Sequence, residues 1–217
     1  MLRINYEKNL NKLHLLIVEM GNLVVASIED SIEALIEKDE DLAEKVIVGD
    51  KDINSLEDQI ETLSFNLLLK EQPVASDLRF VTSAIKIITD LERIGDQAAD
   101  IAYINVKLSH RSYKKEDLGS IIEMAEVAKS MVIDSIEGYI SGDLDLINDV
   151  MERDDVVDDY FKKVRNEVVV DVKEDRFTTK NSLDMLMIAK YLERIGDHTV
   201  NIAERVYYSI TGEVKKG

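Results

Sequence analysis

The hexapeptide LERIGD occurs twice in the chain, at Leu91–Asp96 and again at Leu192–Asp197. The similarity extends beyond it, because DLERIGDQAADIA (Asp90–Ala102) aligns with YLERIGDHTVNIA (Tyr191–Ala203) at an offset of 101 positions (192 minus 91). Each copy carries two carboxylates four positions apart, a basic residue and a glycine, all within a pattern typical of a helix.

A second, weaker correspondence lies upstream of each copy. The stretch Asp30–Asp50 resembles Asp134–Asp154 at an offset of 104 positions (134 minus 30). A repeat of about 100 residues is too long for the unit of a solenoid. The pattern therefore indicates a duplicated small domain.

Each half has the pattern of three long helices. The chain has one proline and nine glycines in 217 residues, so few positions interrupt a helix. Breaks are expected near residues 38–41, at Pro73, at Gly142-Asp143 and near residues 173–180. The expected helices span residues 10–35, 42–70, 74–107, 115–140, 144–170 and 178–210.

These helices predict an all-α fold of two tandem, pseudo-symmetric three-helix bundles, because long helices with short connections favour antiparallel bundles. The first repeat is expected over residues 1–108, a linker over 109–114 and the second repeat over 115–217. A single long coiled coil is the alternative, and Pro73 and Gly142 weaken it.

Composition excludes several functions. Cysteine is absent, which rules out disulfides, thiolate zinc sites and cysteine nucleophiles. The 27 basic and 44 acidic residues give a formal net charge of -17, which disfavours binding to nucleic acid or anionic lipid. No stretch has the length and apolar character of a signal peptide or a membrane span. We therefore expect a soluble, cytoplasmic protein.

The repeated acids fall on apolar stripes of their helices. Glu92 and Asp96 share a stripe with Ile85 and Ile88, because a helix advances about 100° per residue. Glu193 and Asp197 repeat this in the second half. Polar pairs with the same spacing lie on the apolar stripe of the second helix of each half. They are Asp50 with Asn54 and Asp154 with Asp158.

Buried carboxylates must pair, become protonated or bind metal. Arg93 and Arg194 follow the glutamates but point about 100° away from them. One arginine also cannot neutralise three or four acids. Oxygen-only ligands suit iron, manganese, magnesium or calcium, and zinc remains an option. The competing interpretation is a solvated acidic face, which is the usual place for such residues. Gly95 and Gly196 are consistent with close approach of a helix or of a metal cluster.

The three histidines are not expected to bind metal. His110 falls in the linker, and His14 is expected on a helix surface. His198 lies about 140° around its helix from Glu193, so its ring should point elsewhere.

The stretches QPVASDLRF, LERIGDQAADIA and YLERIGDHTVNIAERVYY, with the TGE that follows, resemble the PhoU family of phosphate-transport-system regulatory proteins. The resemblance implies multinuclear metal clusters, with iron or zinc, bound through E(D)-x-x-x-D motifs on each bundle. Asn54 and Asn201 depart from that motif, because each stands where an aspartate would complete it. Carried over by position, the implied ligands are Asp50, Asn54, Glu92, Asp96, Asp100, Asp154, Asp158, Glu193, Asp197 and Asn201.

The resemblance also implies a regulatory adaptor that is not an enzyme. Such a protein would negatively regulate phosphate uptake and phosphate-starvation signalling. Its expected partners are the ATPase of a phosphate ABC transporter and a sensor histidine kinase, with peripheral association to the membrane complex and a homodimer left open. The alternatives are a carboxylate-bridged hydrolase or oxidase, and a metal-free helical scaffold.

Overall fold

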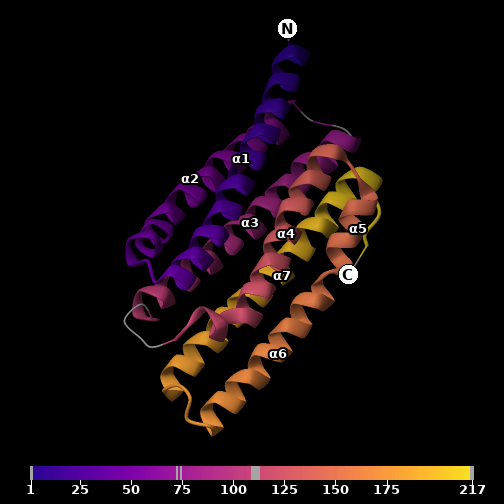
Figure 1. Cartoon of the computed structure of the whole chain (residues 1–217). Helices are drawn as coiled ribbons and strands as arrows, with labels where there is room; N and C mark the ends of the chain where they lie inside the picture. Colours follow the sequence, from indigo (N-terminus) through magenta and orange to yellow (C-terminus); the bar gives the residue numbers. More distant parts are fainter. Residues whose placement is uncertain (1, 72, 74, 109–112, 216–217) are drawn as a thin grey trace.

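The computed structural model describes residues 2–71, 73, 75–108 and 113–215. Almost all of them are helical (Figure 1). The elements in chain order are α1 (Leu2–Glu37), α2 (Glu40–Glu71), α3 (Ala75–Leu108), the 3-10 turn η1 (Lys115–Leu118), α4 (Gly119–Ser141), α5 (Leu144–Glu152), α6 (Asp154–Lys173) and α7 (Thr179–Thr211). The predicted all-α fold of two three-helix bundles is confirmed.

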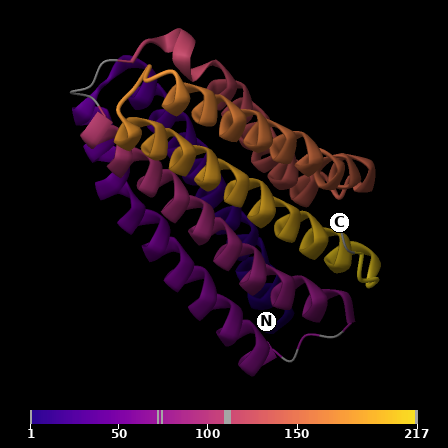
Figure 2. The same cartoon turned by 90° about the horizontal axis from the view of Figure 1, so that it is seen from below.

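The helices form two layers. α2, α3, α7 and α6 run side by side across one layer, with α3 and α7 making the largest contact of any helix pair in the described chain (Figure 2). α1 packs on α2 and α3, α4 packs on α6 and α7, and α1 also contacts α4. The first bundle is therefore α1–α3, and the second is α4–α7.

One hydrophobic core runs through both bundles. Its main cluster of buried side chains includes Ile17 and Leu91 from the first half and Met131 and Leu192 from the second, and a small separate cluster contains Ala34, Ala43, Val46 and Ala102. The two halves therefore pack as one unit.

Local sequence explains where several helices begin and end. Asp143 caps α5, because its Oδ1 accepts hydrogen bonds from the backbone N–H groups of Asp145 at 2.9 Å and Leu146 at 3.2 Å. Gly142 ends α4 with φ of 72°, a left-handed conformation that favours glycine. The expected breaks at both positions follow from this chemistry.

The structure corrects one expected helix. Residues 144–170 do not form a single helix, because the chain turns at Arg153 between α5 and α6. The Arg153 guanidinium binds Ser130 Oγ at 3.0 Å and the carboxylate of Asp134, both on α4, and Asp149 at 2.9 Å on α5. A tertiary contact to α4 thus accompanies the break. In the first half, Gly49 occupies the equivalent position and α2 is continuous.

Part of the predicted boundary lies outside the described residues. This applies to positions 109–112 of the expected linker, including His110, and to Val74 at the expected start of the third helix. Within the described part, Tyr113 Oη donates to the Leu35 carbonyl at 2.7 Å and Lys38 Nζ donates to the Tyr113 carbonyl at 2.9 Å. These bonds attach the start of the second half to the α1–α2 turn.

Candidate metal centres

The first group of acids lies where α2 packs against α3. Asp50 and Asn54 come from α2, and Glu92 and Asp96 come from α3. A Cβ at Gly95 would lie 2.9 Å from Ile53 Cδ1 and 3.5 Å from Asp50 Oδ1. The missing side chain at Gly95 therefore lets α2 approach closely and places the Asp50 carboxylate against α3. We call this group the first centre.

The second group repeats the arrangement between α6 and α7, and we call it the second centre. Asp154 and Asp158 come from α6, and Glu193 and Asp197 come from α7. A Cβ at Gly196 would lie only 2.8 Å from Asp154 Oδ1, a distance that would force the carboxylate to move. Each LERIGD glycine thus faces an aspartate of the neighbouring helix.

Both centres open on the same face of the four-helix layer. Asp96 precedes Asn105 by nine residues, which is about 180° around α3. The Asn105 amide donates to the Ser31 carbonyl of α1 at 2.6 Å, so Asp96 points away from α1. Because α1 and α4 contact each other and the repeat relates the two halves, the second centre faces the same way.

The acids are partly exposed where α2 meets α3 and where α6 meets α7, and the hydrophobic core lies beneath them. The side chains of Glu92 and Glu193 are each 16% exposed, and that of Asp96 is 34% exposed. The stripe of Glu92 contains the buried Ile88, but it also contains Tyr103, which is 55% exposed. The acids therefore mark the border between the core and the open face.

The second centre concentrates negative charge at Asp154. Burial raises the pKa of Asp154 to about 6, and the carboxylates of Asp197 and Asp158 add to the shift. Burial and the charge of Glu193 likewise raise the pKa of Asp197, while Lys190 opposes the rise. This centre therefore favours either a proton or another cation.

The first centre shows the same repulsion. Burial raises the pKa of Asp50, the charges of Asp96 and Asp100 raise it further, and a hydrogen bond from Asn54 opposes them. Burial and Asp96 also raise the pKa of Glu92, which Arg93 partly offsets.

Two oxygens of the first centre lack a hydrogen-bond donor among the described residues. Asn54 Nδ2 donates to Asp50 Oδ2 at 3.1 Å, which leaves Asp50 Oδ1 and Asn54 Oδ1 buried without a partner. Buried acceptors normally have a partner, so each such atom requires an explanation. Carboxylate and amide oxygens are the ligands that hard cations take. These residues therefore fit a metal ion of that class.

The side chains are not arranged as a closed coordination shell. Within the described parts of the chain, no three Asp, Glu or His side chains are grouped closely enough to hold a metal ion as they stand. Arg93 Nε lies 3.4 Å from Glu92 Oε2, its Nη1 lies 3.1 Å from Asp96 Oδ2, and Lys190 forms an ion pair with Glu193. Metal binding would require these acids to turn away from their basic partners.

Two of the proposed ligands lie at the α3–α7 seam. Asn201 Nδ2 donates to Asp90 Oδ1 at 3.2 Å, and Asp100 is hydrogen-bonded to Tyr191, whose pKa is raised by burial and by that carboxylate. The two pairs are equivalent in the repeat, because Asp90 aligns with Tyr191 and Asp100 with Asn201. Both residues therefore contact the opposite bundle, and Asp100 also raises the pKa of Asp50 through its charge.

Of the two histidines that the structure describes, His198 points away from Glu193 as expected, whereas His14 differs from the prediction. His14 is partly buried, because its ring stacks on Phe80 at 4.2 Å between centroids and lies 5.3 Å from Tyr139. Burial lowers the pKa of His14. The expectation of a surface histidine was wrong, since a single helix does not show which neighbours cover it. His198 Nδ1 lies 2.9 Å from Asp90 Oδ1 and joins α7 to α3.

Two further residues at the centres were not predicted. The charge of Glu57 on α2 raises the pKa of Glu92, so Glu57 belongs to the first centre. Its position three residues after Asn54 places it on a similar face of α2 and could have indicated this. Lys190 lies three residues before Glu193, which could likewise have indicated an ion pair.

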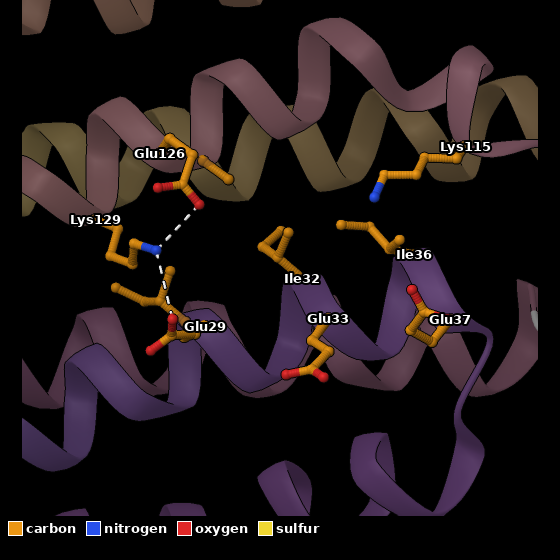
Figure 3. Close-up of a pocket in the computed structure, with 10 residues that line it drawn as sticks. Glu29, Ile32, Glu33, Ile36, Glu37, Lys115, Glu126 and Lys129 are labelled. Atoms are coloured by element: carbon orange, nitrogen blue, oxygen red, sulfur yellow. Dashed lines mark hydrogen bonds and ion pairs between the residues drawn. The ribbon is translucent and has the colours of Figure 1, made fainter.

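A cavity of about 200 Å³ lies elsewhere, between α1 and α4 (Figure 3). Lys129 Nζ lies 3.7 Å from Glu29 Oε1 and 3.0 Å from Glu126 Oε1 at one end, and Ile32 also lines the cavity. Its acids are from different helices than those of the two centres. None of the helices in the described chain combines the length and apolarity that crossing a bilayer requires.

The fold and the two acidic centres define a class of tandem three-helix-bundle proteins, and comparison with known proteins identifies the family. The PhoU domain model matches residues 17–104 and 121–206, so each LERIGD copy falls within a matched stretch. This chain belongs to the PhoU family.

Similar proteins cover nearly the whole chain. A protein of Clostridium acetobutylicum, named phosphate-specific transport system accessory protein PhoU homolog, is 39% identical over 96% of this chain and 95% of its own. The crystal structure of PhoU from Pseudomonas aeruginosa superimposes with a TM-score of 0.91 at 32% identity, covering 96% of this chain and 100% of that one. The PhoU structure from Streptococcus pneumoniae gives 0.89 at 30% identity, with 98% and 100% covered.

Proposed function

We propose that this protein is an accessory regulator of phosphate-specific transport that acts by binding other proteins and not by catalysis. The names of its relatives over nearly the full chain length support this. Its finer role would be to restrain phosphate uptake and phosphate-starvation signalling in the cytoplasm. The proposed partners are the ATPase of the phosphate ABC transporter and a sensor histidine kinase.

We further propose that the two centres bind metal ions, with iron or zinc the first candidates. The two orphaned oxygens of Asp50 and Asn54 carry this proposal, because they are acceptors without a donor in a seam of carboxylates. Asp50, Asn54, Glu92 and Asp96 would hold metal in the first centre, and Asp154, Asp158, Glu193 and Asp197 in the second. A bound cation supplies the positive charge that offsets the repulsion among these acids.

Metal removal tests the second proposal. Elemental analysis of the purified chain should show bound metal, and a strong chelator should lower its melting temperature. A ligand present at 100 times its Kd raises the free energy of unfolding by about 2.7 kcal/mol for each independent site. Glu92→Gln combined with Glu193→Gln should abolish the effect of the chelator. Absence of metal together with unchanged melting in chelator would contradict metal binding.

Co-purification tests the regulatory role separately. The tagged full-length chain is expected to retain the transporter ATPase and the sensor kinase from membranes of its own cells. Phosphate-ester hydrolysis by the same preparation should not exceed that of a Glu92→Gln, Glu193→Gln variant. Turnover that depends on these glutamates would show that the protein is an enzyme and would contradict the proposed adaptor role.

A further inference from the structure

The internal repeat explains why a cavity lies between α1 and α4. These helices meet at Gly21 and Ile136, where a Cβ on the glycine would overlap Ile136 Cδ1. The offset of 104 positions pairs Gly21 with Ala125 (125 minus 21) and Ile32 with Ile136 (136 minus 32). The contact that the repeat relates to the first is therefore between Ala125 and Ile32, and both residues line the cavity. Alanine does not allow the close approach that glycine allows, so space remains at this second contact.

The cavity combines an apolar interior with an acidic surround. Ile32 and Ile36 extend from α1 into the space between the helices, one helical turn apart (Figure 3). We call the surface that surrounds them the α1–α4 groove. Its apolar residues are Ile28, Ile32, Ile36 and Ala125, its acids are Glu29, Glu33, Glu37 and Glu126, and its bases are Lys115 and Lys129. Four acids and two lysines leave a net charge of two negative units.

The acids of α1 form a row along the groove. Glu29, Glu33 and Glu37 are spaced four residues apart, which places successive carboxylates about 6 Å apart along the helix. Lys129 forms an ion pair with Glu29. Glu33 and Glu37 are exposed, and neither forms an ion pair with another residue of the described chain. The groove therefore offers two carboxylates, one helical turn apart, to an external cation.

The size of the cavity favours side chains of a partner protein over a small molecule. Its volume of about 200 Å³ is below the range of roughly 300–1,000 Å³ that is usual for small-molecule sites. Apolar side chains can enter such a space while the backbone that carries them stays outside. An amphipathic helix places its apolar residues in this way, and its flanking residues recur at the same four-residue spacing as the carboxylates of α1.

We propose that the α1–α4 groove binds a basic amphipathic helix of a partner protein. Apolar side chains of that helix pack against Ile32 and Ile36, and its lysines or arginines pair with Glu33 and Glu37. The net charge of -17 adds a longer-range attraction for such a segment. The proposal rests on the adaptor role proposed above and specifies the chemistry of one partner segment.

The repeat also indicates that this site occurs once in the chain. The positions that align with Glu29 and Glu37 are Ile133 and Ser141, so α4 lacks the row of acids that α1 carries. Glu137 aligns with Glu33, and Ile140 aligns with Ile36. Both are exposed residues of α4 that do not line the cavity. They therefore provide control positions that the repeat itself defines.

Binding of a designed peptide to the full-length chain tests the proposal. The probe is a fluorescein-labelled helical peptide of about four turns, with leucines along one face and lysines on both sides of them. One control peptide has glutamate in place of each lysine. A second control has the same composition as the probe, but its leucines are scattered around the helix. Fluorescence anisotropy at about 0.15 M NaCl measures each affinity with exposed charges screened.

Two sets of variants locate the binding. Glu33→Gln with Glu37→Gln should weaken binding of the probe about fivefold, because two exposed ion pairs are lost. The control is Glu137→Gln with Glu152→Gln, which removes the same charge from exposed positions outside the groove. Ile36→Ser should weaken binding about tenfold through loss of apolar contact, whereas Ile140→Ser should change it by less than about twofold. Circular dichroism melting verifies that each variant is folded.

The expected result is that the parent chain binds the probe more tightly than either control peptide, and that only the groove variants weaken it. Equal loss in the groove variants and their controls would overturn the proposal, and so would equal binding of the scattered peptide. A parent chain that retains the transporter ATPase and the kinase but does not bind the probe would overturn the groove alone. A chain that binds the probe at the groove but retains neither protein would overturn the adaptor role instead.

Discussion

At single residues, glycine has two opposite effects in these helices. Gly49 on α2 has no atom within 4 Å of where a Cβ would lie, so its flexibility only weakens the helix. Gly196 has the Asp154 carboxylate at 2.8 Å and Val157 Cγ1 at 3.3 Å from the same point. The first glycine is replaceable, and the second positions a candidate ligand.

Replacing each glycine by alanine should separate these effects. Gly49→Ala should stabilise the protein by about 1 kcal/mol, because alanine is the better helix former. Gly196→Ala should not stabilise the protein, because Asp154 must move to make room for the new methyl group. The same movement should weaken metal binding at the second centre. Urea unfolding and Mn²⁺ titration measure the two quantities. Equal gains in stability from both substitutions would contradict the close packing at Gly196.

Asp154 should make the metal-free protein more stable in mild acid. Its pKa is about 6 in the folded protein, above the ordinary 3.8. The folded state therefore holds this proton more tightly than the unfolded chain, so stability rises as the pH falls from above 6 toward 4. Melting in chelator at pH 8 and at pH 5.5 measures the rise.

Asp154→Asn should reduce this pH dependence, whereas Asp155→Asn, which removes an exposed neighbour, should leave it largely intact. A pH dependence of the opposite sign in the parent chain would mean that Asp154 is paired with a positive group in the folded protein.

At the level of helices, the α3–α7 pair holds the molecule together. Asp90 Oδ1 accepts from Asn201 Nδ2 and contacts His198 Nδ1, and the Asp90 side chain is only 16% exposed. The equivalent pair, Asp100 with Tyr191, lies farther along the same seam. Polar pairs related by the repeat therefore fix the register of these antiparallel helices.

Loss of Asp90 should destabilise the whole chain. Asp90→Ala leaves both partners without their acceptor, and the expected cost is about 1–3 kcal/mol. A double-mutant cycle with His198→Ala, measured by urea unfolding, isolates the coupling between the two side chains. Coupling near zero would show that the His198 contact contributes no net stability, and Asn201→Ala would then test the remaining bond.

The sequence predicted most helix bounds because proline, glycine and the apolar period are local signals. The bend at Arg153 depends on Ser130 and Asp134 of another helix, which a single stretch of sequence does not show. The candidate site could be predicted only in part for the same reason. The Glu92 and Asp96 spacing indicated a shared face, but the i, i+4 pattern continues to Asp100, which lies beside α7.

Residues missed in the centres have a related explanation. Glu57 and Lys190 belong to them only because of how α2 meets α3 and how α6 meets α7. Their spacings from Asn54 and Glu193 are common in helices, so the sequence alone did not distinguish them from surface residues.

For the whole molecule, the net charge of -17 should make stability sensitive to ions. Raising NaCl from about 0.05 M to about 0.5 M should raise the melting temperature by screening repulsion among exposed acids. If the two centres bind metal, micromolar Mn²⁺ should produce a further rise that NaCl does not reproduce. Melting curves in NaCl at the same ionic strength with a strong chelator provide the control for nonspecific screening.

The continuous core has a consequence for the origin of the chain. Neither half can bury the face of α3 or of α7 without the other, because these helices make the largest contact between the bundles. A single-repeat ancestor with this geometry would have needed a second subunit along that face. Gene duplication would then have joined two subunits of a twofold-symmetric dimer into one polypeptide.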